Sequence, residues 1–75
     1  MINNLMIKAN WDSFAKVWVV ESDDVPGLVT EAANMEQLIT KLKILIPELL
    51  ELNKGAVNNN IPFSIASEYS DTVYG

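Results

Sequence analysis

One stretch of this chain has helical periodicity, and it limits the fold more than any other feature. Apolar residues recur there at intervals of three or four, which is typical of an amphipathic helix. They are Met35, Leu38, Ile39, Leu42, Leu45, Ile46, Leu49 and Leu52. Asn34 precedes the stretch as an N-cap residue, and Gln37 completes a variant of the capping box. Gly55 stands where a glycine commonly ends a helix. The sequence therefore predicts one long helix between these two residues, with Lys41 on its solvated side.

Pro47 interrupts the helical pattern. A proline inside a helix removes one backbone hydrogen bond and costs ~3 kcal/mol. The apolar pattern nevertheless continues beyond it. Two alternatives follow: a kinked helix, or a break after which Pro47 opens a last helical turn.

Short alternating or β-branched segments make up the rest, and they predict four strands. They are residues 4–10, 16–22, 28–32 and 62–69. The short link between the first two implies an antiparallel hairpin. Trp11 is expected just after the first strand, as an aromatic residue at the core edge. Residues 70–75 are expected to be frayed.

The segment Asp23-Asp24-Val25-Pro26-Gly27 predicts a tight corner. Pro26 presets the φ of position i+1, and Gly27 supplies the positive φ that position i+2 of a type II turn needs. Asp24 and its neighbour Asp23 are expected to cap local backbone amides. A metal site is disfavoured, because calcium loops place their ligands at alternate positions around a central glycine.

The predicted order is β-β-β-α-β in a single domain, residues 1–75. We expect a two-layer α+β fold with one helix on a four-stranded mixed sheet. The helix would cross over to the fourth strand with the right-handed sense.

One helix covers only one face of such a sheet. Trp18 and Val20 are expected beneath it, because the other face would otherwise bury Glu21 without a partner. Valine residues then lie on the open face with a charged rim, and we assign them as candidate partner-binding residues. The candidates are Val17, Val19, Val29, Glu21 and Glu31. The alternative is that these valines serve strand propensity alone.

The composition argues against several kinds of chemistry. The chain has no Cys and no His, so disulfides, His- or Cys-based zinc sites and His-activated nucleophiles are excluded. We expect no catalytic residue, no cofactor and no metal. The net charge is −5 and there is no Arg, which argues against direct nucleic-acid binding. The charge serves either a basic partner or solubility alone.

No segment is long and apolar enough to indicate a membrane span or a leader. We therefore expect no membrane association and a cytoplasmic protein. A chain of 75 residues buries too little surface to be very stable alone. Association is the remaining source of stability, so a dimer or a bound partner is expected.

Residues 17–42 resemble HicB-like antitoxin domains. Trp18, Asp24, Pro26, Gly27, Thr30 and Glu36 occupy the characteristic positions. The longer pattern, over about residues 5–53, is most similar to an uncharacterised, HicB-related bacterial family, a domain of unknown function. The resemblance implies a partial ribonuclease-H-like fold and a non-enzymatic, antitoxin-like role. Such a domain would bind and neutralise a small basic RNA-cleaving toxin.

Two other functions remain open. One is a structural or regulatory homodimer without a toxin, assembled through the valine face or the edge of the fourth strand. The other is a carboxylate-dependent nuclease, which the absence of clustered carboxylates disfavours.

Overall fold

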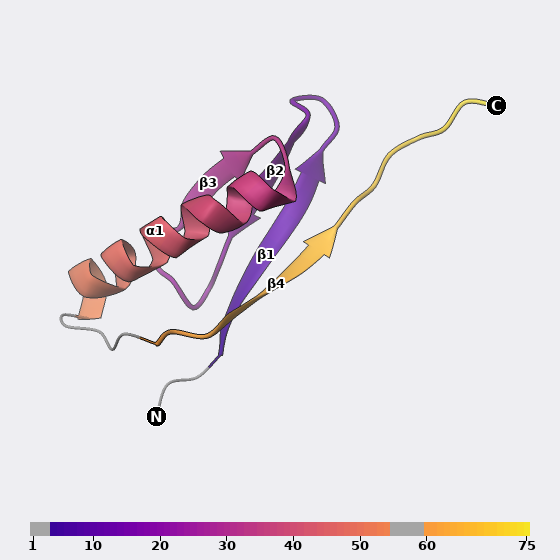
Figure 1. Cartoon of the computed structure of the whole chain (residues 1–75). Helices are drawn as coiled ribbons and strands as arrows, with labels where there is room; N and C mark the ends of the chain where they lie inside the picture. Colours follow the sequence, from indigo (N-terminus) through magenta and orange to yellow (C-terminus); the bar gives the residue numbers. More distant parts are fainter. Residues whose placement is uncertain (1–3, 55–59) are drawn as a thin grey trace.

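The computed structural model describes residues 4–54 and 60–75. The chain forms a two-layer α+β fold in which one helix packs on one face of a four-stranded sheet (Figure 1). The elements are β1 (Leu5–Asp12), β2 (Val17–Glu21), β3 (Val29–Ala32), α1 (Met35–Lys54) and β4 (Phe63–Glu68). This confirms the predicted fold class and the β-β-β-α-β order.

The strands lie in the order β3-β2-β1-β4. β2 pairs antiparallel with both β1 and β3. β4 pairs parallel with β1, with Ile7 opposite Ile65. The sheet is therefore mixed, as predicted, and β3 and β4 are its two edges. The helix spans the long connection that a parallel return requires.

β1 extends two residues further than predicted, so Trp11 lies inside the strand and not after it. Trp11 pairs with Trp18 across the hairpin. The turn is tied by Asp12, whose carboxylate accepts hydrogen bonds from the amides of Phe14 at 3.0 Å and Ala15 at 3.1 Å. Because the carboxylate satisfies the loop amides, the ladder can continue up to the turn.

The predicted corner forms at residues 25–28. The Leu28 amide donates to the Val25 carbonyl at 3.1 Å, and Gly27 has a φ of 85°, as a type II turn requires. The corner also inserts Val25 fully into the core, which the sequence analysis missed. A turn residue is thus also a core residue.

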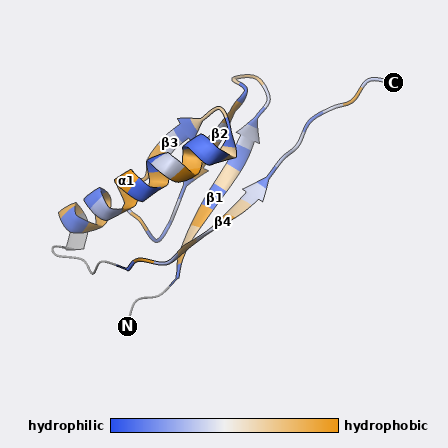
Figure 2. Ribbon diagram, viewed as in Figure 1, coloured by the Kyte–Doolittle hydropathy of each residue, from blue (hydrophilic) through white to orange (hydrophobic). Residues whose placement is uncertain are grey.

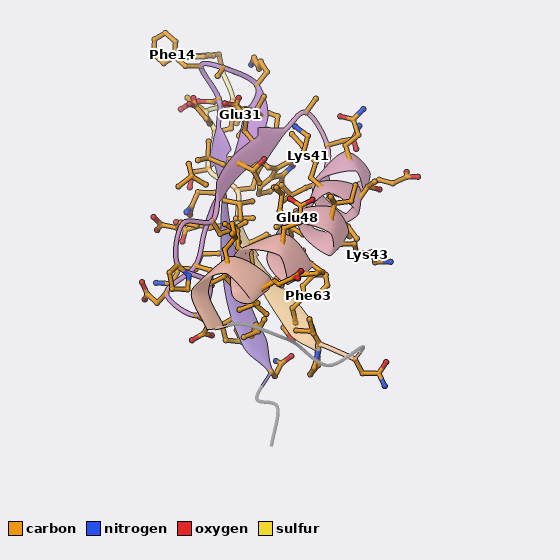
Figure 3. The ribbon with its side chains drawn as sticks, turned by 90° about the vertical axis from the view of Figure 1, so that its left-hand side faces the viewer. Phe14, Glu31, Lys41, Lys43, Glu48 and Phe63 are labelled. Atoms are coloured by element: carbon orange, nitrogen blue, oxygen red, sulfur yellow. The ribbon has the colours of Figure 1, made fainter. Side chains whose placement is uncertain are left out.

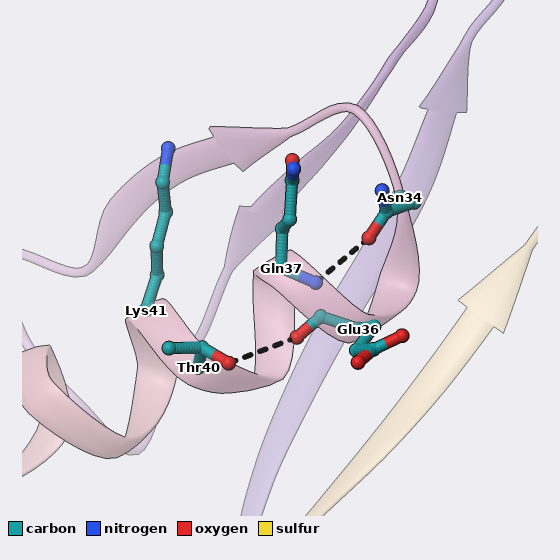
Figure 4. A pocket seen from close by; sticks show the side chains of 5 residues that line it. All are labelled: Asn34, Glu36, Gln37, Thr40 and Lys41. Carbon is teal, nitrogen blue, oxygen red and sulfur yellow. Dashed lines mark hydrogen bonds between the residues drawn. The ribbon is translucent and has the colours of Figure 1, made fainter.

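Helix α1 begins at Met35, and Asn34 caps its start as predicted (Figure 4). The Asn34 side-chain oxygen accepts a hydrogen bond from the Gln37 amide at 2.8 Å. The Asn34 carbonyl accepts the first helical bond, from Leu38. The side chain therefore satisfies one of the amides that every helix start leaves unpaired.

The core lies between α1 and the sheet. Figure 2 shows hydrophobic residues recurring along α1 and along the strands. Its buried helical side chains recur every four residues, at Leu38, Leu42, Ile46 and Leu50. The expectation that Leu52 belongs to this face is wrong, because its side chain is 82% exposed. Six residues beyond Ile46, the helix has rotated by about 600°, which directs Leu52 away from the sheet.

Pro47 lies inside α1, and the helix continues without a break to Lys54. The alternative in which the helix breaks and Pro47 opens a last turn is therefore wrong. Buried side chains on both sides of the proline, Ile46 and Leu50, hold the two parts of the helix on one sheet. Gly55, predicted to end the helix, lies outside the described residues.

Truncation of the central helical side chain is predicted to destabilise the domain strongly. Leu42→Ala removes a fully buried side chain and should lower the free energy of unfolding by about 2–5 kcal/mol. Leu52→Ala is the matched control and should change it by less than ~0.5 kcal/mol. Urea denaturation followed by circular dichroism measures both. Equal losses in the two variants would contradict the assignment of the buried face.

Candidate protein-binding surface

The sheet face opposite α1 is open over the described residues. Strand alternation places Val17, Val19 and Glu21 of β2 on this face, with Val29 and Glu31 of β3. Val29 is 80% exposed and Val19 is also exposed, whereas Val17 is half-buried. Trp18 and Val20 face the helix instead, as predicted, and Val20 is fully buried.

The register decides how the candidate residues meet. Val29 lies opposite Glu21, and Glu31 lies opposite Val19. Each apolar side chain therefore has a carboxylate as its cross-strand neighbour. Val17 lies further along β2, opposite Asp12 of β1. The five candidate residues thus form a mixed surface of valines and carboxylates and not a continuous apolar patch.

The charge of the open face is mostly negative. Glu21, Glu31 and Glu68 lie on it, and Lys8 contributes a cation opposite Glu21 on β1. Glu68 extends the acidic character to β4, because it pairs with Asn10 on the same face. Glu68 was not among the residues predicted for this face, because only the register places β4 beside β1. The open face therefore combines exposed valines with a mostly negative charge.

Asp24 and Ser22 hold one end of this surface together. The Asp24 carboxylate accepts a hydrogen bond from the Met6 amide at 2.8 Å, and the Ser22 hydroxyl donates to the Met6 carbonyl at 2.6 Å. The expectation that Asp24 caps a local amide is therefore wrong. The Asp24 and Ser22 side chains thus bind the backbone of Met6 at a position of β1 that lies beyond the end of β2. Pro26 and Gly27 stay in the structural role predicted for them.

Lys41 ties the helix to the edge of the sheet. Its ammonium donates to the Glu31 carbonyl at 2.6 Å, across from α1 to β3 (Figure 3). The prediction of a merely solvated lysine missed this bond, because it depends on how the helix lies over the strand. The bond fixes the backbone that carries Glu31.

An aromatic cluster lies at the end of the sheet near the hairpin. Trp11 stacks on Tyr69 with a centroid distance of 5.4 Å, and meets Trp18 edge-on at 5.4 Å. The Trp11 indole nitrogen is buried and has no hydrogen-bond partner among the described residues. Leaving a buried N–H unpaired costs free energy, whereas the ring contacts of the cluster are stabilising.

Tyr69 and Asp71 are electrostatically coupled. The Tyr69 hydroxyl donates to the Asp71 carboxylate at 2.9 Å, and the Thr72 amide donates to the same carboxylate at 2.8 Å. The Thr72 amide and then Tyr69 lower the pKa of Asp71. The bond to Asp71 in turn raises the pKa of Tyr69.

The described residues contain no group of three or more Asp or Glu side chains placed to hold a metal ion. Over the same residues, no helix is long and apolar enough to cross a membrane. A hollow at the start of α1 is lined by Asn34, Glu36, Gln37, Thr40 and Lys41 (Figure 4). Its carboxylate, amide, hydroxyl and ammonium groups are ordinary helix-surface groups.

The fold and the surface define a small two-layer α+β domain with one open, acidic sheet face. Residues 4–74 match the family described as "Domain of unknown function (DUF1902)", and the chain belongs to that family. A crystal structure of a hypothetical protein, TTHA1013 from the extremely thermophilic bacterium Thermus thermophilus, is similar at 45% identity. That likeness covers 97% of this chain and 100% of the other, with a TM-score of 0.72. Comparison with curated proteins gives no match.

Substitutions of Asp24 and Asp23 test the hydrogen bond between the Asp24 carboxylate and the Met6 amide of β1. Asp24→Ala removes the acceptor of the Met6 amide and should lower the free energy of unfolding by about 1–3 kcal/mol. Asp23→Ala removes the same charge from the adjacent exposed position and should change it by less than ~0.5 kcal/mol. Thermal unfolding at neutral pH compares the two. A larger loss of stability in Asp23→Ala than in Asp24→Ala would contradict the assignment of the Met6 hydrogen bond to Asp24.

The coupling of Tyr69 to Asp71 predicts a defined pH response. The pKa of Asp71 should lie below 3.8, so its interactions are complete above that pH and are lost as the pH falls through the lowered pKa. Asp71→Asn should move the pKa of Tyr69 back toward 10.0. Carbon-detected NMR titration of the two side chains measures both. An unchanged Tyr69 pKa in this variant would refute the coupling.

Proposed function

We propose that this protein is a non-enzymatic, antitoxin-like binding module of the HicB-like kind. It binds a small basic RNA-cleaving toxin through the open sheet face and neutralises it in the cytoplasm. The surface consists of Val17, Val19 and Val29 with Glu21 and Glu31, and no direct contact with nucleic acid or membrane is required.

The observation that carries the proposal is the open face itself. α1 covers the opposite face, so a whole side of the sheet stays accessible over the described residues, and Val29 is 80% exposed on it. Its carboxylates outnumber its lysine, which favours association with a cationic surface and speeds the encounter. Exposed valines between the charges add apolar contact area once water is expelled.

Non-catalytic binding fits the chemistry of the chain better than catalysis does. With no His and no Cys in the sequence, the usual general acids, bases and nucleophiles are missing. A ribonuclease-H-like reaction needs several carboxylates around divalent cations. The open-face carboxylates are instead distributed along strands and face valine, lysine or asparagine across the sheet.

Affinity capture from the host cell tests the proposal. The tagged protein should recover a small basic protein, identified by mass spectrometry, and the purified pair should show suppressed RNA cleavage. Val17→Lys/Val19→Lys should lower the recovery at least about tenfold, because two cations then oppose a basic partner.

The matched control is Ile44→Lys/Leu52→Lys. It adds the same two charges at exposed apolar positions of α1, away from the open face. Recovery should be unchanged in this variant. Equal loss in both variants would mean that overall charge and not the open face governs binding. Recovery of this chain alone would refute the toxin-binding role and favour the homodimeric alternative.

A further inference from the structure

The last residues of the chain form an extended arm whose side chains are exposed. Beyond Tyr69 the arm, residues 70–75, has no helix or strand and runs away from the sheet in the direction of β4 (Figure 1). Val73 is 92% exposed and Tyr74 is 91% exposed. The family match extends to residue 74, and the similar crystal structure is covered over its whole length. The family match therefore includes most of the arm.

The two edges of the sheet differ in how they are protected. At β3, Lys41 occupies the Glu31 carbonyl and places an ammonium group at the edge, which is a common protection against strand addition. Among the described residues β4 pairs with β1 on one side only, and none of its six residues is a lysine or a proline. The edge most open to another strand is thus β4, directly next to the arm.

Charge indicates what would pair with this edge. The chain carries 10 acidic residues, and residues 60–75 contain only two of them, Glu68 and Asp71, and no lysine. Association of two such acidic chains meets the least repulsion along this segment. A basic partner would instead be attracted to the open sheet face. The nearly neutral segment therefore suits a second copy of this chain.

We propose that the arm pairs with the β4 edge of a second copy, and that the second copy returns the same contact. Six extended residues span about 20 Å, which matches the length of β4. A strand and its acceptor edge on one chain give a self-complementary, two-fold interface. The two sheets then join into one, and their open faces remain free.

Strand alternation specifies which arm residue meets the core. Phe63 and Ile65 face the helix side of β4 and are only half-buried at this edge. Tyr69 stacks on Trp11 on that same side, so Val73 continues the series. In the dimer Val73 covers the half-buried side chains of the partner's β4 on the helix side.

Sedimentation equilibrium of the purified, full-length chain tests this proposal without any toxin. The wild-type chain should have about twice its 8.3 kDa mass. Val73→Asp should raise the dimer dissociation constant at least about tenfold, because it buries a carboxylate in the interface. The variant should fold normally, since Val73 is almost fully exposed in the single chain. Hydrogen exchange of the β4 amides should be slow in the wild-type dimer and faster in this variant.

Two controls make the result specific. Phe14→Asp adds the same charge at a side chain that is 99% exposed at the hairpin tip, and should leave the dimer intact (Figure 3). Val17→Lys/Val19→Lys should also remain dimeric, which separates this interface from the proposed toxin-binding face. A wild-type mass of one chain would overturn the proposal. A dimer that Val73→Asp leaves unchanged, or that the open-face variant dissociates, would overturn it as well.

Discussion

The packing of one helical face against one sheet face is the contact on which this structure depends. Leu38, Leu42 and Ile46 are fully buried against Ile7 and Val20 of the sheet. Each such side chain contributes about 1.5–3 kcal/mol, and a chain of this size has few others to bury. The chain has no disulfide to supplement this core. The continuity of α1 through Pro47 follows from the same contact, because the buried residues on either side of the proline share one sheet.

Over the described residues a single helix covers one face of the sheet and leaves the other face uncovered. The covered side is apolar, while the uncovered side alternates valines with carboxylates. The two edges of the sheet also differ. Lys41 binds the Glu31 carbonyl at the β3 edge, whereas the β4 edge lies next to the exposed arm. Open face and open edge differ in charge. The partners proposed for them differ accordingly, a basic protein for the face and a second copy for the edge.

Side-chain contacts join segments of the chain that are not paired by backbone hydrogen bonds of the sheet. Asp24 and Ser22 bind β1 beyond the end of β2, and Asp12 closes the hairpin. Tyr69 joins the end of β4 to Trp11. These contacts place the corner, the hairpin and the start of the arm on a fixed frame. The open sheet face is therefore held by the fold, whereas the arm beyond Tyr69 has no helix or strand of its own.

Local patterns in the sequence determined the fold class, the element order and the two faces of the sheet. Alternation, helical spacing, the Asn34 cap and the Pro26-Gly27 turn each act within a few residues. The structure confirms the four strands, the single helix, the cap and the turn that they predict. The burial of Val25, the bond from Asp24 to Met6 and the stacking of Tyr69 on Trp11 were decided by tertiary structure alone. Each of these contacts joins a residue to others distant in sequence, or depends on the rotation of an element. The same holds for Leu52, whose exposure follows from the accumulated rotation of α1, and for Glu68, which reaches the open face only because β4 pairs with β1.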